Sequence, residues 1–370
     1  MNIIFSQNEL AKALSIVQNA AQNKVTSNTY NGIFMKADAT GVELQANDYA
    51  IAIKTQCPAV VKEEGMVVIA SPQLPSMIKL LPPGDVICEQ KPGEGFITFK
   101  TDNAVYRFPI RNVDEFPFLN ELDKTNSCSI SGKDLTEMAN SVQFAAATDK
   151  QKPFFTGVLF EIKESSFAMA ATNTHRLATK EITLSMPSEN PGRLIVPSSV
   201  LSEVVRLLSQ EDDELCEITW ANQHVAFSFG DTYFISNLIS GEYPDYKRVI
   251  PTQFSLRAVM NLADIRSAVS MVTPISRDMS YKTINFHFED NTLEIYEEDK
   301  SIGSSRIVIP CEMEGETLHI IFNCFYIEDI LKHSKGEKII FNLMKNGPLL
   351  VEQEEDKSYR YVVTPMRGHQ

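Results

Sequence analysis

A chain of 370 residues with 43% hydrophobic and 22% charged side chains has the length of about two or three domains and the composition of a soluble globular protein. It contains no apolar run of about 18 residues, which excludes a membrane-spanning helix, and residues 1–5 lack the basic start of a secretory leader, so we expect a cytoplasmic protein. The net charge of −14 is spread as −3, −6 and −5 over residues 1–125, 126–250 and 251–370. This distribution argues against a simple basic nucleic-acid-binding domain and leaves open a positive charge confined to one face.

Six segments have apolar residues at helical spacing and are predicted to be amphipathic helices. In chain order they span residues 8–24, 72–81, 132–146, 198–208, 257–272 and 324–335. Much of the remaining chain alternates apolar and polar residues as half-buried strands do, for example at 95–100, 225–229 and 284–288, with turn signals at 82–85, 230–231 and 290–291. Helices on one face of antiparallel sheets predict an α+β fold.

A short apolar strand that leads into a helix start occurs three times, at residues 67–72, 194–198 and 320–324. The equivalent positions Ser71, Pro197 and Asn323 are separated by 126 residues each time. Two equal offsets predict three copies of one domain in series, at 1–124, 125–250 and 251–370. Proline-containing stretches at 114–117 and 241–244 are the predicted linkers.

The sequence has none of the motifs of common enzymes: no G-x-S-x-G, no Walker A loop, no G-x-G-x-x-G and no H-E-x-x-H. Six histidines show no metal-ligand spacing, and six scattered cysteines without a C-x-x-C pair are expected to be reduced, buried thiols. The acidic runs at 211–214 and 297–299 are expected to be solvated. We therefore predict a non-enzymatic protein with no catalytic residue, metal or cofactor.

The pair His175 and Arg176 is present in the middle third and absent from the other two. Two interpretations stay open for it. Arg176 is part of a structural pair with a carboxylate and His175 is a core residue, or the two residues belong to a functional site that departs from the shared scaffold.

The six predicted helices contain nine lysines and arginines against seven acids, so they sum to +2 and the rest of the chain to −16. Ordinary solvated helix faces explain this difference for any single helix. If all six helices line one surface, that surface suits sequence-independent contact with phosphates.

Three segments carry a resemblance to a known family. They are the T-x-x-H-R-L-A motif at 172–178, the segment GEYPDYKRVIP at 241–251 and the terminal YVVTPMR at 361–367. Together they strongly resemble bacterial DNA sliding clamps, the β subunits of DNA polymerase III, over the whole chain. The resemblance implies three clamp domains and a ring-shaped head-to-tail homodimer. Helices would line the inside of the ring and antiparallel sheets would form the outside.

The resemblance also implies a function: a processivity factor that encircles duplex DNA without sequence specificity and tethers its partners. Those partners would be the DNA polymerase III catalytic subunit, the clamp loader and other proteins with a clamp-binding motif. The implied partner-peptide site consists of Phe155, Thr172, Thr174, His175, Arg176, Leu177, Pro244, Arg248, Val249, Pro348, Leu350, Val362, Thr364, Pro365, Met366 and Arg367. Thr174, Thr364 and the tail at 368–370 depart from the family pattern.

The resemblance implies two further sets of residues. The DNA contacts would come from Lys24, Lys79, Lys150, Lys152, Phe154, Arg206, Lys332 and Lys335. The dimer interface would use Tyr106, Arg107, Phe108, Met271, Val272, Glu297 and Glu298. In it Tyr106 and Phe108 would meet Met271 and Val272, and Lys91, Lys100 and Arg107 would face the acids at 297–299.

Two rival functions remain open at this point. One is a hydrolase that uses His175 with an acid from the run at 211–214, which residual activity on small esters or phosphates would reveal. The other is a monomeric peptide-binding adaptor that never encircles DNA, which a monomeric mass at micromolar concentration would favour.

Overall fold

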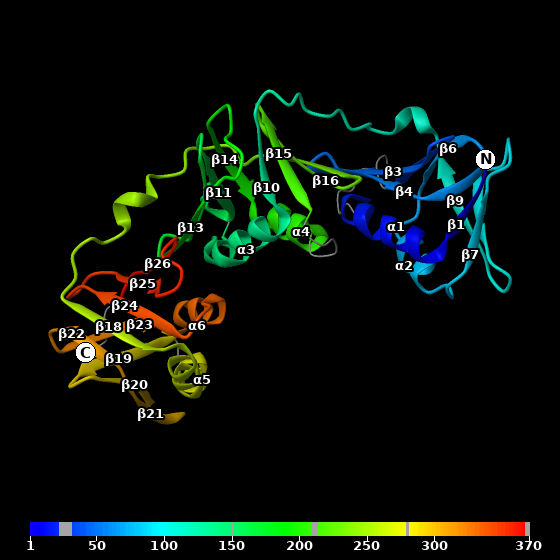
Figure 1. Cartoon of the computed structure of the whole chain (residues 1–370). Helices are drawn as coiled ribbons and strands as arrows, with labels where there is room; N and C mark the ends of the chain where they lie inside the picture. The colour runs from blue at the N-terminus through cyan, green and yellow to red at the C-terminus, as the bar shows by residue number, and fades with distance from the viewer. Residues whose placement is uncertain (22–31, 150, 209–213, 279–280, 367–370) are drawn as a thin grey trace. The chain divides into compact units, whose positions relative to one another are not determined.

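The computed structural model describes residues 1–21, 32–149, 151–208, 214–278 and 281–366 (Figure 1). Contacts within the chain gather it into two units. The first unit contains residues 1–133 and 203–238, and the second contains residues 134–202 and 239–370. Among the described helices, none is long and apolar enough to cross a membrane.

The first unit contains a 13-stranded sheet in the order β10-β15-β16-β17-β4-β3-β2-β6-β9-β8-β7-β1-β5. Neighbouring strands in it pair antiparallel. The strands are β1 (Asn2–Ser6), β2 (Ile33–Asp38), β3 (Gly41–Asn47), β4 (Ile51–Cys57), β5 (Ala59–Glu63), β6 (Gly65–Ile69), β7 (Asp85–Glu89), β8 (Phe96–Lys100), β9 (Val105–Arg111), β10 (Ser127–Ser131), β15 (Leu215–Ala221), β16 (His224–Phe229) and β17 (Thr232–Asn237).

Helices α1 (Gln7–Ala21) and α2 (Leu74–Lys79) contact each other in this unit, and α1 packs on β3 and β4. Leu10, Leu14 and Val17 of α1 are fully buried, as their helical spacing predicts. Burying side chains of this size stabilises the fold by about 1.5–3 kcal/mol each. The short 3₁₀ turn η1 (Val113–Glu115) precedes the segment that crosses the sheet at 116–122.

The second unit contains a nine-stranded sheet in the order β14-β11-β12-β13-β26-β25-β24-β18-β22 and a four-stranded sheet in the order β21-β20-β19-β23. These strands are β11 (Gly157–Ile162), β12 (Ser166–Thr172), β13 (Arg176–Thr183), β14 (Gly192–Pro197), β18 (Leu256–Asn261), β19 (Thr283–Glu289), β20 (Thr292–Asp299), β21 (Gly303–Pro310), β22 (Glu312–Gly315), β23 (Leu318–Asn323), β24 (Lys338–Leu343), β25 (Leu349–Gln353) and β26 (Tyr359–Val363).

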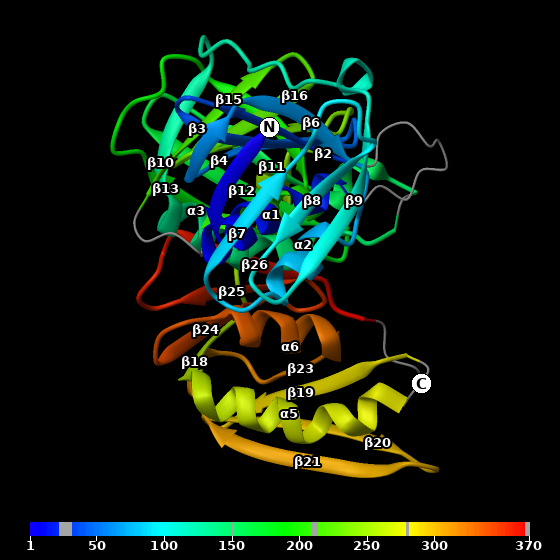
Figure 2. The same cartoon turned by 90° about the vertical axis from the view of Figure 1, so that its right-hand side faces the viewer.

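Helices α5 (Leu262–Asp278) and α6 (Cys324–His333) lie side by side in the second unit, and α5 packs on β20 and β21 (Figure 2). Helices α3 (Gly132–Val142) and α4 (Ser198–Leu208) contain the points where the chain passes between the two units. Three 3₁₀ turns complete the list: η2 (Gln143–Ala145), η3 (Pro153–Thr156) and η4 (Tyr246–Val249).

The repeated strand-to-helix step is confirmed. Strands β6, β14 and β23 each run into a helix, namely α2, α4 and α6. The start of one predicted helix is wrong: residues 257–261 belong to strand β18, which pairs with β22 and β24, and α5 begins only at Leu262. The signal for the true start is Asn261, whose Oδ1 accepts hydrogen bonds from the amides of Ala263 and Asp264.

The predicted domain boundaries stay predictions, because the sheets of the structure run across them. β17 of the middle third pairs with β4 of the first, and β13 of the middle third pairs with β26 of the last. The middle third therefore contributes strands to both units.

Candidate functional site

A cavity of about 490 Å³ lies in the second unit, over the pairing of β13 with β26. It gathers residues from five separate stretches of sequence. They are Phe155, Thr172, Thr174, His175, Arg176, Leu177, Tyr243, Pro244, Asp245, Tyr246, Val249, Pro348, Val362 and Thr364. This volume lies within the range of about 300–1,000 Å³ that is typical of ligand sites.

The floor of the cavity is apolar and rests on the core. Leu177 and Val362 face each other across the β13–β26 ladder, and both are almost fully buried. Phe155, Tyr243 and Tyr246 join them in one buried cluster. Burial raises the pKa of both tyrosine hydroxyls, so these groups stay protonated near neutral pH. Such a floor suits an apolar side chain of a ligand.

The turn at residues 172–176 forms one wall and is held by its own side chains. Thr172 Oγ1 accepts a hydrogen bond from the Thr174 amide at 3.1 Å and donates one to the carbonyl of Arg176 at 2.6 Å. Asn173 Oδ1 accepts hydrogen bonds from the amides of His175 and Arg176 at 3.0 Å each. Thr174 has a φ of +79°, a strained value for a β-branched residue. The turn is therefore preformed, with strain stored at Thr174.

Arg176 lines the cavity, but its guanidinium reaches the carboxylate of Asp329 on α6 at 2.5 Å and donates to the carbonyl of Phe144. It lies over the rings of Phe144 and Tyr326, at 5.6 and 4.7 Å from their centroids. The side chain is only 9% exposed. The interpretation of Arg176 as a structural pair is confirmed.

His175 is exposed, so the prediction of a core histidine is wrong. Its backbone carbonyl accepts hydrogen bonds from the amide and hydroxyl of Thr364. This pair of bonds ties the turn to the segment after β26 and fixes the rim of the cavity.

Most of the predicted partner-site residues line this cavity, and four of the described ones do not. Leu350 is buried beneath it in the core cluster, and Arg248 points into solvent, paired with Asp245 at 3.0 Å. Pro365 and Met366 are half-buried outside the lining, where the Met366 amide bonds the carbonyl of Ile321. Arg367 lies outside the described residues.

Sequence reasoning missed three residues of the lining: Tyr243, Asp245 and Tyr246. All three belong to the 241–251 segment that carries the family resemblance. Tyr246 also bonds Glu161 through its hydroxyl at 3.0 Å. The aromatic residues that flank Pro244 were therefore the available signal.

The predicted DNA-contact residues divide into three groups. Lys79, Lys152 and Lys332 are exposed. Arg206 forms a bidentate pair with Glu203, Lys335 pairs with Glu137 at 3.2 Å, and Phe154 is half-buried against Phe155. Lys24 and Lys150 lie outside the described residues.

The predicted dimer contact needs a correction at three residues. Phe108, Val272 and Glu297 are 4%, 0% and 6% exposed within their own chain, because each points to the inner side of its strand or helix. Burial raises the pKa of the Glu297 carboxyl. Val105, Arg107, Met271 and Glu298 are exposed in their place, and Tyr106 is half-buried.

The rival catalytic arrangement gains no support from the described residues. Residues 211–213 of its acidic run lie outside them, and no group of three or more histidine, cysteine or acidic side chains within them suits a metal ion. All six cysteines are buried and unpaired with one another, as predicted, and burial raises the pKa of each thiol.

The tandem α+β repeat and its preformed apolar cavity define a three-domain clamp protein. The N-terminal, central and C-terminal domain models of the DNA polymerase III beta subunit match residues 1–120, 129–245 and 247–367. The chain belongs to this family of bacterial sliding clamps.

Relatives of known name match the chain over nearly its full length. It is 24% identical to the beta sliding clamp of Chlamydia muridarum over all of both chains, and 27% identical to that of Staphylococcus epidermidis over 95% of each. The solved sliding clamps of Bacillus subtilis and Pseudomonas aeruginosa superpose with TM-scores of 0.94 each, at 23% and 24% identity over all of both chains. These structures establish the clamp fold.

Proposed function

We propose that this protein is a non-enzymatic processivity factor for a DNA polymerase. Two copies close a head-to-tail ring around duplex DNA, and the cavity on each copy holds a short segment of a partner. The observation that carries the proposal is the cavity itself, because five distant stretches of sequence converge on one preformed, largely apolar site.

The ring needs strand edges that can pair, and two of the edges that are open within the described residues suit it. Residues 105–108 of β9 pair only with β8, and β21 pairs only with β20. Open edges invite pairing with another chain. Exposed apolar side chains accompany both edges: Val105 at 61% beside β8, and Met271 and Val308 at 53% and 57% near β21. If the β9 edge of each copy pairs with the β21 edge of the other, the two identical contacts close a ring.

Charge supports the same contact. Lys100 and Arg107 belong to the β8–β9 side, and Glu298 and Asp299 belong to the β20–β21 side. Opposite charges on the two edges favour the head-to-tail pairing and disfavour like edges meeting.

The cavity is the proposed tether for the polymerase catalytic subunit, the clamp loader and other partners. A leucine or phenylalanine of a partner would cover Leu177 and Val362, while the exposed Arg248 at its edge favours an acidic neighbour. Tethering replaces repeated bimolecular binding with a high effective concentration, which is how a weak peptide contact gives processivity.

The test combines mass, topology and peptide binding. Light scattering is expected to give twice the chain mass. The protein, once loaded, is expected to stay on nicked circular DNA and leave after linearisation. Val249→Ala shortens a side chain that is 56% exposed in the cavity, and it should weaken binding of a leucine-containing polymerase-tail peptide about threefold to tenfold.

Val60→Ala is the matched control, since Val60 on β5 is 62% exposed and outside the cavity. If the protein were a monomer that binds the peptide normally, it would be a peptide-binding adaptor and not a ring-shaped clamp. If the two variants bound the peptide with equal affinity, this cavity would not be the peptide-binding site.

A further inference from the structure

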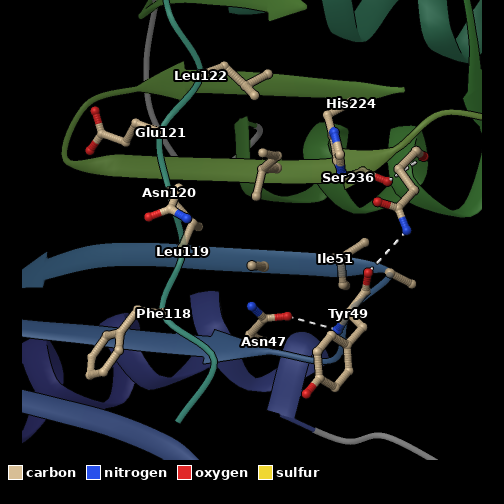
Figure 3. Close-up of a pocket in the computed structure, with 14 residues that line it drawn as sticks. Asn47, Tyr49, Ile51, Phe118, Leu119, Asn120, Glu121, Leu122, His224 and Ser236 are labelled. Carbon is tan, nitrogen blue, oxygen red and sulfur yellow. Dashed lines mark hydrogen bonds between the residues drawn. The ribbon is translucent and has the colours of Figure 1, made fainter. Parts of the chain in front are cut away.

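A second cavity, of about 310 Å³, lies in the first unit over the pairing of β4 with β17 (Figure 3). Its floor includes Ala52 and Ile235, which face each other across that ladder. The segment at 118–122 crosses the strands beside it. The function proposed above does not use this cavity.

The internal repeat makes this cavity the counterpart of the partner cavity. Ala52 pairs with Ile235 as Leu177 pairs with Val362, and Ile51 pairs with Ser236 as Arg176 pairs with Val363. The ladders therefore share one register, and an apolar pair occupies the same place in both floors.

The turns before the two ladders also share three hydrogen bonds from backbone amides to side chains. The Tyr49 amide donates to Asn47 Oδ1 at 2.8 Å, as the Thr174 amide donates to Thr172. Asp48 Oδ1 accepts hydrogen bonds from the amides two and three residues later, and Asn173 Oδ1 does the same in the other turn. Tyr49 has a φ of +66°, close to the +79° of Thr174. The backbone frame of the partner cavity is thus present twice in this chain.

The crossing segment is fixed in place before any ligand arrives. The amides of Leu119 and Leu122 donate to Gln45 Oε1 at 3.3 Å and to the Tyr233 hydroxyl at 2.8 Å. Asn47 Nδ2 donates to the carbonyl of Pro117 at 2.8 Å. Phe116 packs against Phe34 in the core of the first unit. Its counterpart Tyr243 is likewise buried in the core cluster beneath the partner cavity. A prefixed wall lowers the entropic cost of binding.

One equivalent position of the two crossing segments has opposite charge. Glu121 holds the position that Arg248 holds in the other crossing segment, 127 residues later. Glu121 lines the cavity, none of the lysines or arginines that the structure describes does, and Asp48 belongs to the adjoining turn. Phe118 and Tyr49 add aromatic surface at the rim, at 48% and 57% exposed.

We propose that this cavity is a second peptide-binding site, which takes an extended segment of another protein with one leucine- or phenylalanine-sized anchor beside a lysine or arginine. The apolar floor at Ala52 and Ile235 receives the anchor. The carboxylate of Glu121 attracts the basic neighbour, although its existing pair with Lys54 reduces that attraction. The smaller volume limits the site to one anchor, whereas the partner cavity has room for more.

The experiment uses the full-length protein with isoleucine methyl groups labelled for NMR. The probe is the capped tetrapeptide acetyl-Lys-Leu-Phe-Lys-amide, and acetyl-Glu-Leu-Phe-Glu-amide is its acidic match. We expect the basic probe to shift the methyl signals of Ile51 and Ile235 with a dissociation constant below about 1 mM, and the acidic probe to bind there at least about fivefold more weakly.

Two variants test the charge. Glu121→Lys should weaken the basic probe about fivefold, and Asn120→Lys should act in the same direction without breaking the pair of Glu121 with Lys54. Arg248→Glu changes the equivalent position of the partner cavity. It should leave unchanged the shifts that the basic probe causes at the methyl groups of Ile51 and Ile235. The proposal is overturned if 2 mM basic probe leaves both methyls unmoved, if both variants bind it as wild type does, or if the acidic probe binds equally well.

Discussion

Arg176 lines the partner cavity, and its guanidinium is held against α6 by Asp329. The guanidinium is buried, donates hydrogen bonds to Asp329 and to the carbonyl of Phe144, and lies over the rings of Phe144 and Tyr326. Removing one partner of a buried pair typically costs about 3–5 kcal/mol, and the 40% exposure of Asp329 reduces that figure here.

We therefore expect Arg176→Met to lower the free energy of unfolding by about 2–3 kcal/mol in a urea titration. Arg176→Lys should restore less than half of the loss, because an ammonium group cannot make two directed bonds and stack at once. A lysine variant as stable as wild type would mean that only the charge of Arg176 matters.

Thr174 is the second residue with a distinct expectation. Its φ of +79° costs a β-branched side chain about 1–2 kcal/mol, whereas glycine adopts this backbone freely. Glycine also loses more entropy on folding, by about 0.5–1 kcal/mol.

Thr174→Gly should therefore raise the free energy of unfolding by up to about 1 kcal/mol, measured by urea denaturation. Thr174→Ala is the control, because alanine keeps most of the backbone strain and should gain little. If the alanine variant gained as much as the glycine variant, the strain would not come from the backbone angle.

At the scale of elements, a buried lysine joins three segments of the second unit. Lys180 on β13 bonds Glu137 of α3 and Asp356 between β25 and β26, the latter at 2.9 Å, and it is 7% exposed. Lys335 after α6 adds a second bond to Glu137 at 3.2 Å. The bond from Lys180 lowers the pKa of Glu137. The pKa of Asp356 is also lowered, since hydrogen bonds from Ser358 and Lys180 outweigh the effect of burial.

These directions fix the pH dependence of the network. A carboxylate with a lowered pKa stabilises the fold fully above its ordinary pKa, and this stabilisation is lost as pH falls through the lowered value. The two carboxylates of the network therefore stabilise the fold fully above about pH 5 and lose that effect below it.

Lys180→Met removes the one hydrogen-bond donor that contributes to both shifts, while Ser358 and Lys335 keep their own bonds to Asp356 and Glu137. The difference in urea midpoint between wild type and Lys180→Met should be largest at pH 6–7 and shrink steadily from about pH 5 to pH 3. Glu137→Gln combined with Asp356→Asn provides a control in which the two carboxylates cannot titrate. A difference that stays constant over this range would rule out the network as its source.

The sequence predicted elements better than it predicted which side chains meet. Equal offsets of 126 residues located the strand-to-helix steps, because both the apolar run and the helix start are local signals. The error at 257–261 has a local cause: β18 is buried and short, and its apolar residues continue without a break into the face of α5. Only the cap at Asn261 separates the two.

The candidate sites depend on long-range pairing, which a single sequence does not reveal. Val249 and Leu177 share a cavity although they lie 72 positions apart, and only the family motifs pointed to that grouping. Phe108 and Val272 were predicted to be on the surface and are buried. Exposure depends on which face of the strand or helix a residue occupies, and a shift of one position moves a strand side chain to the other face. Val105 and Met271 are the exposed neighbours.

At the scale of the whole molecule, charge argues that the protein holds DNA by enclosing it. The chain carries −14, and two of the predicted basic contacts, Arg206 and Lys335, are already paired with acids. Direct binding to phosphates should then be weak and should fall further with salt. Retention on DNA would have to come from ring closure.

A substitution at the proposed ring contact separates enclosure from affinity. Val105→Glu places a carboxylate on the exposed β9 edge, where it would meet the acidic β20–β21 side of the partner copy. We expect monomers in analytical ultracentrifugation at micromolar concentration and no retention on nicked circular DNA after gel filtration. Val60→Glu, on the equally exposed β5, should leave both the dimer and the retention intact.

Direct affinity supplies the last comparison. Because Val105→Glu leaves the helices unchanged, its weak, salt-sensitive binding to short linear duplex DNA should equal that of wild type within about twofold. Equal affinity together with lost retention can arise only if the ring itself holds the DNA. A Val105→Glu protein that stayed on circular DNA as a monomer would instead assign retention to direct contacts, and the ring would have no part in it.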